Sequence, residues 1–239
     1  MPEWLSEPDR AFAQSESQRA LDALMTVTKA LWVNHPQRHV RANSKPAQLF
    51  VAQQLGLDIP PTVATNDPEQ ARGLVSQQDG RAIYKAMSQN LKLGRGQALF
   101  TGLLTETELA NLELIRVSPG IFQKFVPKAY EVRATVVGRR VFSGKIDSQA
   151  SAETQVDWRH RPFDMEQTPI ALPPELEAKI HEFMEAFGLV YGAFDFIVTP
   201  DGRYVFLEIN PAGQYMWVET KTKLPITMAL ADVLSSGAS

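Results

Sequence analysis

Three oxygen-bearing side chains near the C-terminus have the types and spacing of a metal site. They lie in the stretch FDFIVTPDGRYVFLEINPAG, from Phe194 to Gly213, where two alternating apolar runs flank Asp201-Gly202. Such a dipeptide between alternating runs is typical of a two-residue hairpin turn. With that turn, Asp195 is predicted to lie opposite Glu208, and Asn210 follows two residues later on the same face.

Two carboxylates placed opposite each other on a β-ladder repel, so the arrangement calls for an explanation. Carboxylate and amide oxygens suit Mg²⁺ better than Zn²⁺, and a Mg²⁺ ion bound by Asp195, Glu208 and Asn210 would turn the repulsion into coordination. The alternative interpretation is a solvated sheet face that carries scattered acids. The same register predicts a uniformly apolar opposite face, in which Phe194 pairs with Ile209, Phe196 with Leu207 and Val198 with Val205.

Two lysines are placed where a bound anion would stabilise them. Lys85 lies in the otherwise apolar segment AIYKAM, where an ammonium group needs a partner, either a phosphate or a neighbouring carboxylate. Lys45 lies at the start of a predicted helix, where the helix dipole favours an anion beside the lysine. The LGRG loop that ends at Gly96 could cover phosphates through its backbone amides, although the chain has no GxxxxGK[ST] motif.

The segment FQKFVPKAYEVR, from Phe122 to Arg133, has the features of a nucleotide contact. The strand predicted in it ends at a proline, which leaves backbone groups that can hydrogen-bond a flat base. Glu131 and Arg133 share one face of the next strand, where the carboxylate could hold ribose hydroxyls and the guanidinium a phosphate or a developing oxyanion. An exposed ion pair between the two is the alternative. Two further arginines and Trp158 lie in the polar stretch DWRHR.

Composition and motifs argue against several classes of protein. The chain has 239 residues, 44% of them hydrophobic, and its formal net charge of -3 provides no basic surface for general nucleic-acid binding. It has no cysteine and no GxSxG or HExxH motif, so thiol, serine-hydrolase and HExxH-type zinc chemistry have no support. No apolar run is long enough to span a membrane, and MPEWLSEPDRAF is not typical of a signal peptide. We therefore expect a cytoplasmic protein with no nucleic-acid or membrane partner.

The order of predicted elements is typical of an α+β protein with antiparallel hairpins. Apolar spacing and terminal Ser, Asp, Pro or Gly residues predict helices over about 10–31, over 44–57, from Asp67-Pro68 onward, over 106–114, over 174–189 and after Pro225. Strands are expected over 62–65, 81–87, 98–105, 120–126, 130–138 and 139–147, and in the hairpin 194–210. Residues 88–97 are expected to form a mobile loop, and the polar stretch 148–174 has no clear period.

The order of these features resembles the ATP-grasp superfamily: a lysine before a helix, a strand lysine, a glycine loop, a hinge strand followed by an acid, and D…E-x-N on a hairpin. More narrowly, the segments WVNHP, RANSKPAQLFVAQQLGLDIPPTVATNDP, KIDSQ, VDWR and FLEINPAGQYMWVE resemble the RimK-like, peptide-maturing ATP-grasp ligases, the microviridin-type or graspetide macrocyclases. The resemblance runs from about Trp32 to Glu219. It implies an ATP-grasp fold, in which two α+β subdomains grip ATP.

The resemblance assigns a role to each matching position. It implies that Lys45 and Lys85 contact the nucleotide phosphates, and that Asp195, Glu208 and Asn210 bind Mg²⁺. The hinge segment that meets adenine corresponds to Gln123, Lys124, Phe125 and Val126, and Glu131 matches the ribose position. The residues near the γ-phosphate and the acyl phosphate correspond to Arg133, Arg159 and, in KIDSQ, Lys145.

The chemistry implied by the resemblance is ATP-dependent activation of a carboxylate. An acyl phosphate forms with release of ADP, and a hydroxyl or amine then displaces phosphate to give an ester or amide. In the resembled family both groups belong to one precursor peptide, which has a leader and a core with acidic and hydroxyl side chains, so the product is a macrocycle. Two alternatives stay open: a RimK-like ligase that adds an amino acid to a small molecule or protein tail, and a nucleotide-binding module without turnover.

The resemblance also predicts the domain organisation. Residues 1–43 would be a helical remnant of a truncated pre-ATP-grasp region, because only about 31 residues precede Trp32 where the family has several strands. Residues 44–122 would form the N-terminal ATP-grasp subdomain, and residues 123–239 the C-terminal subdomain with the metal-binding hairpin. A homodimer is the assembly that the resemblance suggests.

Overall fold

The computed structural model describes residues 2, 4–77, 81–87, 92–93, 97–98, 102–151, 154–158 and 165–236. The chain forms two compact units, Met1–Trp32 and Val33–Ser239. Arg159 and most of the predicted loop 88–97 lie outside the described residues. No helix in the described ranges is long and apolar enough to cross a membrane.

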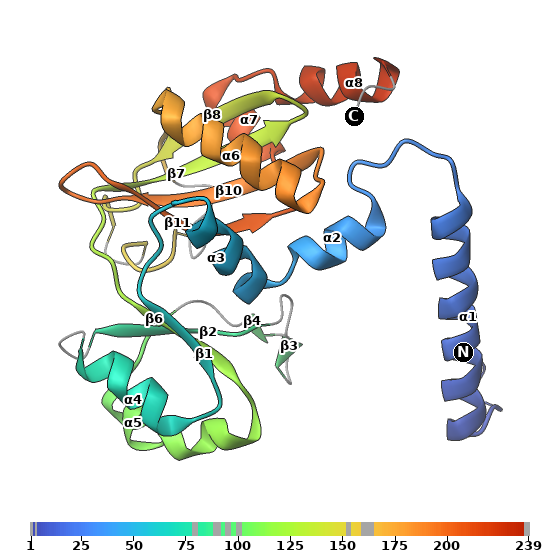
Figure 1. Cartoon of the computed structure of the whole chain (residues 1–239), viewed down its shortest axis with the longest axis horizontal. Coiled ribbons are helices and arrows are strands. Elements are labelled where there is room, and N and C mark those ends of the chain that lie inside the picture. Colours follow the sequence, from blue (N-terminus) through green and yellow to red (C-terminus); the bar gives the residue numbers. More distant parts are fainter. Residues whose placement is uncertain are drawn as a thin grey trace. The chain divides into compact units, whose positions relative to one another are not determined.

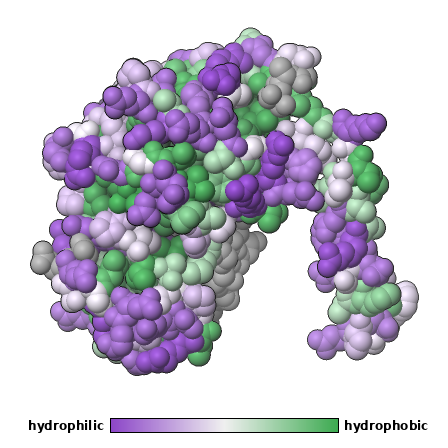
Figure 2. All heavy atoms as spheres, in the orientation of Figure 1, coloured by the Kyte–Doolittle hydropathy of each residue, from purple (hydrophilic) through white to green (hydrophobic). Residues whose placement is uncertain are grey.

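The first unit contains helix α1, Glu7–Val27 (Figure 1). Ser6 caps it by accepting a hydrogen bond from Asp9 N at 3.3 Å, and a proline lies in its first turn, where a missing N–H leaves no helical bond unmade. The helix therefore begins before the predicted start at Arg10, and it ends at Val27 because Thr28 is extended. None of its residues, all of which are described, is buried, and polar and apolar side chains both face outward (Figure 2).

The second unit is built on antiparallel sheets. Its described strands form a four-stranded sheet of order β1-β6-β2-β5, a five-stranded sheet of order β11-β10-β7-β8-β9, and the pair β3-β4. The strands are β1 Thr62–Thr65, β2 Ala82–Lys85, β3 Lys92–Leu93, β4 Gln97–Ala98, β5 Gly102–Leu103, β6 Gly120–Lys124, β7 Tyr130–Val137, β8 Arg140–Ile146, β9 Gln167–Pro169, β10 Tyr191–Val198 and β11 Tyr204–Asn210. The helices are α2 Pro36–Ala42, α3 Lys45–Gln54, α4 Pro68–Ser76, α5 Glu106–Ala110, the 3-10 helix η1 Leu112–Val117, α6 Pro174–Phe187, α7 Met216–Thr222 and α8 Ile226–Ser236.

Most predicted elements are confirmed, and the differences lie in short ones. The helix expected over 174–189 is α6, which ends at a left-handed Gly188, and the helix that begins at Lys45 ends near Gly56 as predicted. The sequence patterns did not predict α2, α7, β9 or the short strands β3 and β4, which have two to seven residues each and carry little periodicity. The strand expected over 98–105 is reduced to β5, and the helix over 106–114 divides into α5 and η1.

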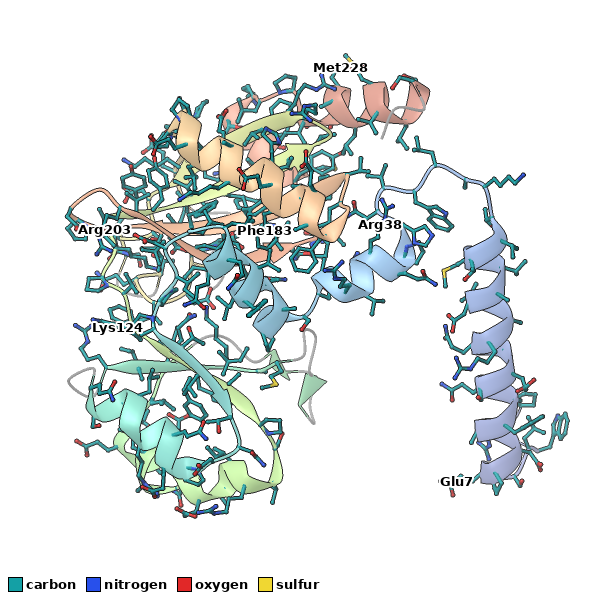
Figure 3. All side chains as sticks on the ribbon, viewed as in Figure 1. Glu7, Arg38, Lys124, Phe183, Arg203 and Met228 are labelled. Atoms are coloured by element: carbon teal, nitrogen blue, oxygen red, sulfur yellow. The ribbon has the colours of Figure 1, made fainter. Side chains whose placement is uncertain are left out.

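The main core lies between one face of the five-stranded sheet and helices α3 and α6 (Figure 1). Residues at even positions of β7 and β10, such as Val132 and Phe194, point to this face and are buried. Phe183 of α6 (labelled in Figure 3) has its ring centroid 5.3 Å from Phe194 and 5.4 Å from Phe206 of β11. Because side chains alternate along a strand, odd-numbered residues of β7 and β10 point to the other face, and this face carries the charged residues.

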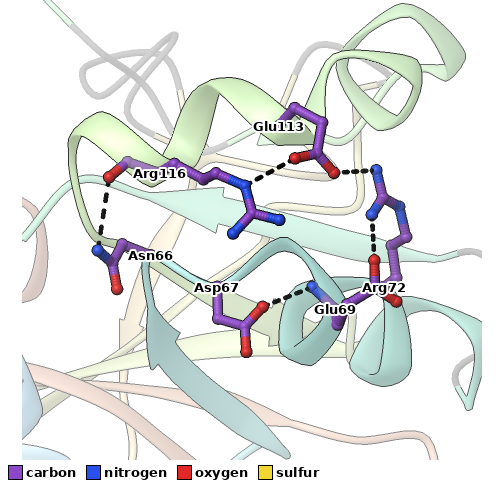
Figure 4. Close-up of polar contacts among 6 residues, drawn as sticks. All are labelled: Asn66, Asp67, Glu69, Arg72, Glu113 and Arg116. Atoms are coloured by element: carbon purple, nitrogen blue, oxygen red, sulfur yellow. Dashed lines mark hydrogen bonds and ion pairs between the residues drawn. The ribbon is translucent and has the colours of Figure 1, made fainter.

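Helices α4 and η1 cover the four-stranded sheet. The core between them includes Ala71 of α4, Leu112 of η1 and Phe122 of β6. Arg72 of α4 bonds Glu69 at 2.6 Å and Glu113 of η1 at 2.9 Å, and Arg116 bonds Glu113 at 2.8 Å (Figure 4). These side chains are largely exposed, so the ion pairs add little to the apolar packing that holds α4 in place.

The hairpin β10–β11 differs from the prediction near its turn. Gly202 adopts φ 84°, and Thr199 N donates to Arg203 O at 3.0 Å, so the connection has three residues, 200–202, rather than two. The pairs Phe196–Leu207 and Val198–Val205 were therefore wrong: Phe196 faces Phe206, and Ile197 faces Val205.

A β-bulge then restores the predicted register at the charged end of the hairpin. The register shifts between Asp195 and Phe196, so that Phe194 pairs with Ile209 and Asp195 with Glu208, as predicted. Without the bulge, the three-residue turn would place Glu208 opposite Phe194, on the core face. The extra residue thus directs Glu208 to the face that carries Asp195.

The change from one sheet to the other lies between Lys124, the last residue of β6, and Tyr130, the first residue of β7. The expected subdomain boundary at 122/123 falls inside β6, a few residues earlier. The short segment 125–129 therefore joins the two sheets.

Candidate active site

A row of charged residues crosses the face of the five-stranded sheet that is opposite α6. Asp195 is paired with Glu208 on one side and with Arg133 on the other. Arg133 Nη1 donates to Asp195 Oδ2 at 2.7 Å, and the two side chains are 7% and 14% exposed. The strand register therefore holds a buried ion pair beside a second carboxylate, and the suggested surface ion pair between Glu131 and Arg133 does not form, because Arg133 pairs with Asp195.

Lys45 meets this row from the first turn of α3. Its Nζ lies 3.1 Å from Glu208 Oε2, and both side chains are less than one-fifth exposed. A pair with so little solvent contact is screened less than a surface pair. The structure thus brings together two residues that are distant in sequence and that the sequence analysis assigned to one site.

Asp195, Glu208 and Asn210 present the oxygens that Mg²⁺ prefers. Asn210 pairs with Ala193, so its side chain follows Glu208 along the same face, and the three residues line one polar cleft. The described residues contain no group of three or more His, Asp or Glu that could hold a metal, which leaves the amide as the third protein donor. A carboxylate has about four lone-pair sites, so an ion pair does not exhaust it. The donor set fits a Mg²⁺ ion.

A cleft between the two sheets gathers most of the predicted nucleotide residues. The four-stranded sheet and the segment after it contribute Lys85 and the segment 123–126, and the five-stranded sheet contributes Glu131, Asp195 and Glu208. The side chains of Ile83, Ile197 and Leu207 also line it. Apolar side chains suit a flat base, and the charged end suits phosphates and a cation.

The hinge segment is fixed in place by its own backbone bonds. Lys124 N donates to Pro61 O at 2.9 Å, and Phe125 N donates to Arg81 O at 3.0 Å. Gln123 Nε2 donates to Thr62 Oγ1 at 2.8 Å, while its buried Oε1 has no hydrogen-bond partner among the described residues. These hydrogen bonds attach the segment to its neighbours, and the two backbone N–H groups are already bonded within the protein.

Glu131 is buried next to Lys128, a residue that the sequence analysis did not identify. Lys128 Nζ lies 2.5 Å from Glu131 Oε1 and also donates to Val156 O at 3.1 Å. Burial raises the pKa of the Glu131 carboxyl above its usual value, and the charge and hydrogen bond of Lys128 oppose this shift. The spacing of three residues in PKAYE was the only sequence signal for the pair.

We expect Lys128→Met to destabilise the protein more at neutral than at acid pH. The pKa of Glu131 is raised on folding, so its contribution to stability is full below its unfolded pKa and is lost as the pH rises through the folded pKa. Removing Lys128 raises that pKa further and leaves a buried carboxylate unpaired at about pH 7, where urea unfolding should show a loss of about 3 kcal/mol. At about pH 5 a larger share of the Glu131 carboxyl is protonated than at about pH 7, so the loss should be smaller. Equal losses at both pH values would contradict this assignment.

The structure does not bring Lys145 into the site. Lys145 pairs with Val132, which is buried in the core face, and its Nζ lies 4.6 Å from the ring centroid of Tyr130. Paired residues share a face, so Lys145 points away from Arg133, which pairs with Gly144. The prediction of Lys145 as a residue near the acyl phosphate is therefore wrong.

An aromatic cavity adjoins the charged row. It has a volume of about 1100 Å³, and its lining includes Trp158, Tyr191, Tyr215 and Trp217. Trp158 packs on Trp217 with ring centroids 4.8 Å apart. Trp158 lines this cavity, the polar cleft and the cleft between the two sheets. This side chain therefore lies where the three spaces meet.

The loop after β11 closes against Arg133. Tyr191 OH donates to Gly213 O, and a Cβ on Gly213 would lie 2.5 Å from Arg133 Nη2, so this position requires glycine. Asn34 donates to Tyr191 O at 2.7 Å and to Pro211 O at 2.8 Å, which ties the start of β10 to this loop. His39 lines both the aromatic cavity and the polar cleft.

Two α+β layers with a cleft between their sheets form an ATP-grasp fold, and solved structures of this fold resemble the chain closely. Macrocyclase MdnC from Microcystis aeruginosa MRC, bound with precursor peptide MdnA, is 34% identical, with a TM-score of 0.86 over 100% of this chain and 75% of MdnC. A RiPP-associated ATP-grasp ligase of Chryseobacterium gregarium, in complex with ADP and a leader and core peptide, is 32% identical, with a TM-score of 0.89 over 99% of this chain and 72% of that one. Macrocyclase MdnB from Microcystis aeruginosa MRC is 32% identical, with a TM-score of 0.78 over 98% and 73% of the two chains.

The chain belongs to the peptide-maturing ATP-grasp ligases. No protein-family model matches it, and no curated protein does. The α+β ATP-grasp fold predicted from the sequence is confirmed.

Proposed function

We propose that this chain is an ATP- and Mg²⁺-dependent ligase that joins side chains of a ribosomally made precursor peptide into ester or amide crosslinks. The observation that carries the proposal is the convergence of Lys85, the segment 123–126, Glu131, Asp195 and Glu208 on one cleft. Two of the related enzymes named above are bound with precursor, leader or core peptides, and one of these two is also bound with ADP. A chain without cysteine that consumes ATP suits the cytoplasm, where we propose that it acts.

We assign the nucleotide to the cleft between the two sheets. The segment 123–126 faces the adenine, and Glu131, held by Lys128, lies at the ribose. Lys85 from β2 and Lys45 from α3 contact the phosphates. In this assignment Lys45 bonds Glu208 when no nucleotide is bound and shares its charge between Glu208 and a phosphate when one is.

Asp195, Glu208 and Asn210 would hold the Mg²⁺ ion. A bound Mg²⁺ neutralises the charge that gathers on the phosphates during transfer. Arg133 and Lys45 hold the two carboxylates in position, because each cation attracts its partner across a short distance.

Arg133 is the residue that we assign to the transferring phosphoryl group. Its Nε is buried and has no hydrogen-bond partner among the described residues, while its Nη1 is bonded to Asp195. A buried donor without a partner is costly, and a phosphate oxygen would satisfy it. Arg159, which lies outside the described residues, is proposed as a second arginine near the same group on the resemblance alone.

The reaction proposed here has two steps. A peptide carboxylate attacks the γ-phosphorus of ATP, so that the bond to ADP breaks and an acyl phosphate forms. A hydroxyl or amine of the same peptide then attacks the acyl carbon and loses its proton, and phosphate leaves. We propose that the peptide approaches from the aromatic cavity, because Trp158 and Trp217 line both that cavity and the polar cleft that contains the charged row.

The proposal predicts that a cognate precursor peptide loses the mass of one water for each bond formed, with one ADP released per bond. Mass spectrometry of the peptide and a coupled ADP assay measure the two quantities on the same sample. Added hydroxylamine should intercept the acyl phosphate and give a hydroxamate in place of the crosslink. ADP release that depends on a free amino acid rather than on the peptide would favour the amino-acid ligase. Nucleotide binding without ADP release would favour a binding module.

A further inference from the structure

The end of β11 that carries the predicted metal ligands lies at the edge of its sheet. The strand order places β10 on one side of β11 and no described strand on the other. An edge strand leaves backbone N–H and C=O groups that need partners when they are buried. At the turn end, Phe206 N donates to Asp58 O at 2.8 Å. At the other end, the partner is a side chain of α3.

Gln48 supplies that partner. Its Oε1 accepts a hydrogen bond from Ile209 N at 3.0 Å, and its Nε2 donates to Ile209 O at 2.9 Å. The second hydrogen on Nε2 is donated to Ala42 O, at the end of α2, at 2.6 Å. The side chain is 1% exposed, so its amide takes the place of a neighbouring strand at one residue of β11.

Ile209 lies between Glu208 and Asn210, and its own side chain is fully buried in the core. Fixing both backbone groups of Ile209 sets the backbone orientation on either side of it, and so the directions in which Glu208 and Asn210 project. Lys45 lies one helical turn before Gln48 on the same face of α3 and bonds Glu208 itself. A single helix therefore holds the backbone and the carboxylate of the same strand.

We propose, on the basis of the proposed function, that Gln48 is a positioning residue for the metal site. Its side-chain amide hydrogen-bonds both backbone groups of Ile209 and so orients Glu208 and Asn210 toward the bound cation. Gln48 touches neither the nucleotide nor the metal. The amide is suited to this task because it has an acceptor and two donors, which match one N–H and two carbonyl groups. A carboxylate lacks the donors, and a methionine lacks all three bonds.

The test compares Gln48→Met with Gln53→Met, the same substitution at an exposed position of the same helix. Calorimetry measures the binding of a non-hydrolysable ATP analogue to each protein with and without Mg²⁺. For Gln48→Met we expect the affinity with Mg²⁺ to fall by about ten- to a hundredfold, as for other groups that orient a metal ligand, and the affinity without Mg²⁺ to stay the same. Gln53→Met should bind like wild type. Gln48→Asn, which keeps the amide but is one methylene shorter, replaces Gln48→Met if the latter does not fold.

A second readout separates positioning from a general loss of stability. Ile180→Val, on the buried face of α6, should lower the unfolding temperature while leaving the hydrogen bonds between α3 and β11 in place, and it should keep the wild-type Mg²⁺ dependence. If Gln48→Met loses stability but keeps the wild-type ratio of affinities with and without Mg²⁺, the inference is wrong while the proposed function stands. If wild type itself shows no Mg²⁺-dependent binding, the proposed function fails, and the inference fails with it.

Discussion

Replacing Glu208 with Gln should abolish most turnover while leaving the protein folded. The substituted amide would keep the shape of the side chain but lose the charge that binds Mg²⁺ and that pairs with Lys45 at 3.1 Å. Loss of a residue that only orients a metal ligand costs about ten- to a hundredfold, so we expect the loss of a direct ligand to exceed about a hundredfold. The rate of peptide-stimulated ADP release at several Mg²⁺ concentrations measures this effect.

Two opposing changes keep the effect on stability small. The variant loses the ion pair with Lys45, but it also loses the repulsion between Glu208 and Asp195, which are paired across the ladder. Thermal unfolding without ligand should therefore change little. Glu185→Gln, an exposed acid on α6, is the matched control for charge removal and should turn over like wild type. Normal turnover by Glu208→Gln would exclude Glu208 as a ligand.

Replacing Arg133 with Met should affect stability and turnover together. The guanidinium forms a buried ion pair with Asp195 at 2.7 Å, and removing one partner of such a pair costs about 3 kcal/mol because the other charge is left unpaired. In addition, the γ-phosphate would lose a charge-assisted donor, which we expect to lower the turnover rate by about 10²- to 10³-fold. Urea unfolding and ADP release measure the two effects separately.

The double variant Arg133→Met with Asp195→Asn separates these effects. Because both partners of the ion pair are removed, its stability should recover toward that of wild type, while its turnover should fall below that of Arg133→Met, since a metal ligand and an arginine are both missing. If the double variant is no more stable than Arg133→Met, the ion pair is not the source of the stability loss. If Arg133→Met turns over normally, Arg133 has no role in transfer.

The hairpin shows how far pattern reasoning reaches at this site. Alternation and the Asp201-Gly202 signal place Asp195 opposite Glu208, and this pairing is confirmed, but the turn length on which it rested is wrong. The three-residue turn and the β-bulge each shift the register by one residue, in opposite directions. The predicted register therefore holds from Asp195 back toward the start of β10. No residue type marks that bulge, because its position depends on the packing of Phe206 and Ile209 on α6 and α3.

Lys145 shows the opposite case, in which the predicted strands already determine the direction of the side chain. Strands were predicted over 130–138 and 139–147, and a two-residue connection at Gly138-Arg139 pairs Val132 with Lys145. The same register argument that placed Glu208 beside Asp195 therefore puts Lys145 on the core face.

Gln48 and Lys128 could not have been selected from the sequence. Gln48 lies in KPAQLFVAQQ beside Gln53 and Gln54, which are exposed, and its type does not distinguish it from them. Only the approach of α3 to the edge of β11 shows that one of the three is buried. Lys128 follows a proline in a connecting segment, where a lysine is usually solvated. Burial of these two side chains depends on tertiary contacts that local patterns do not contain.

The most direct test of a MgATP site in the cleft between the two sheets is a calorimetric titration of the wild-type chain with a non-hydrolysable ATP analogue, with and without Mg²⁺. Asp195 and Glu208 line both the cleft that Lys85 and the segment 123–126 also line and the polar cleft to which Asn210 contributes. We predict saturable binding that Mg²⁺ strengthens by about tenfold or more, which is about 1.4 kcal/mol. Binding of equal strength with and without Mg²⁺, or no binding in either condition, would contradict the assignment of these residues to a MgATP site.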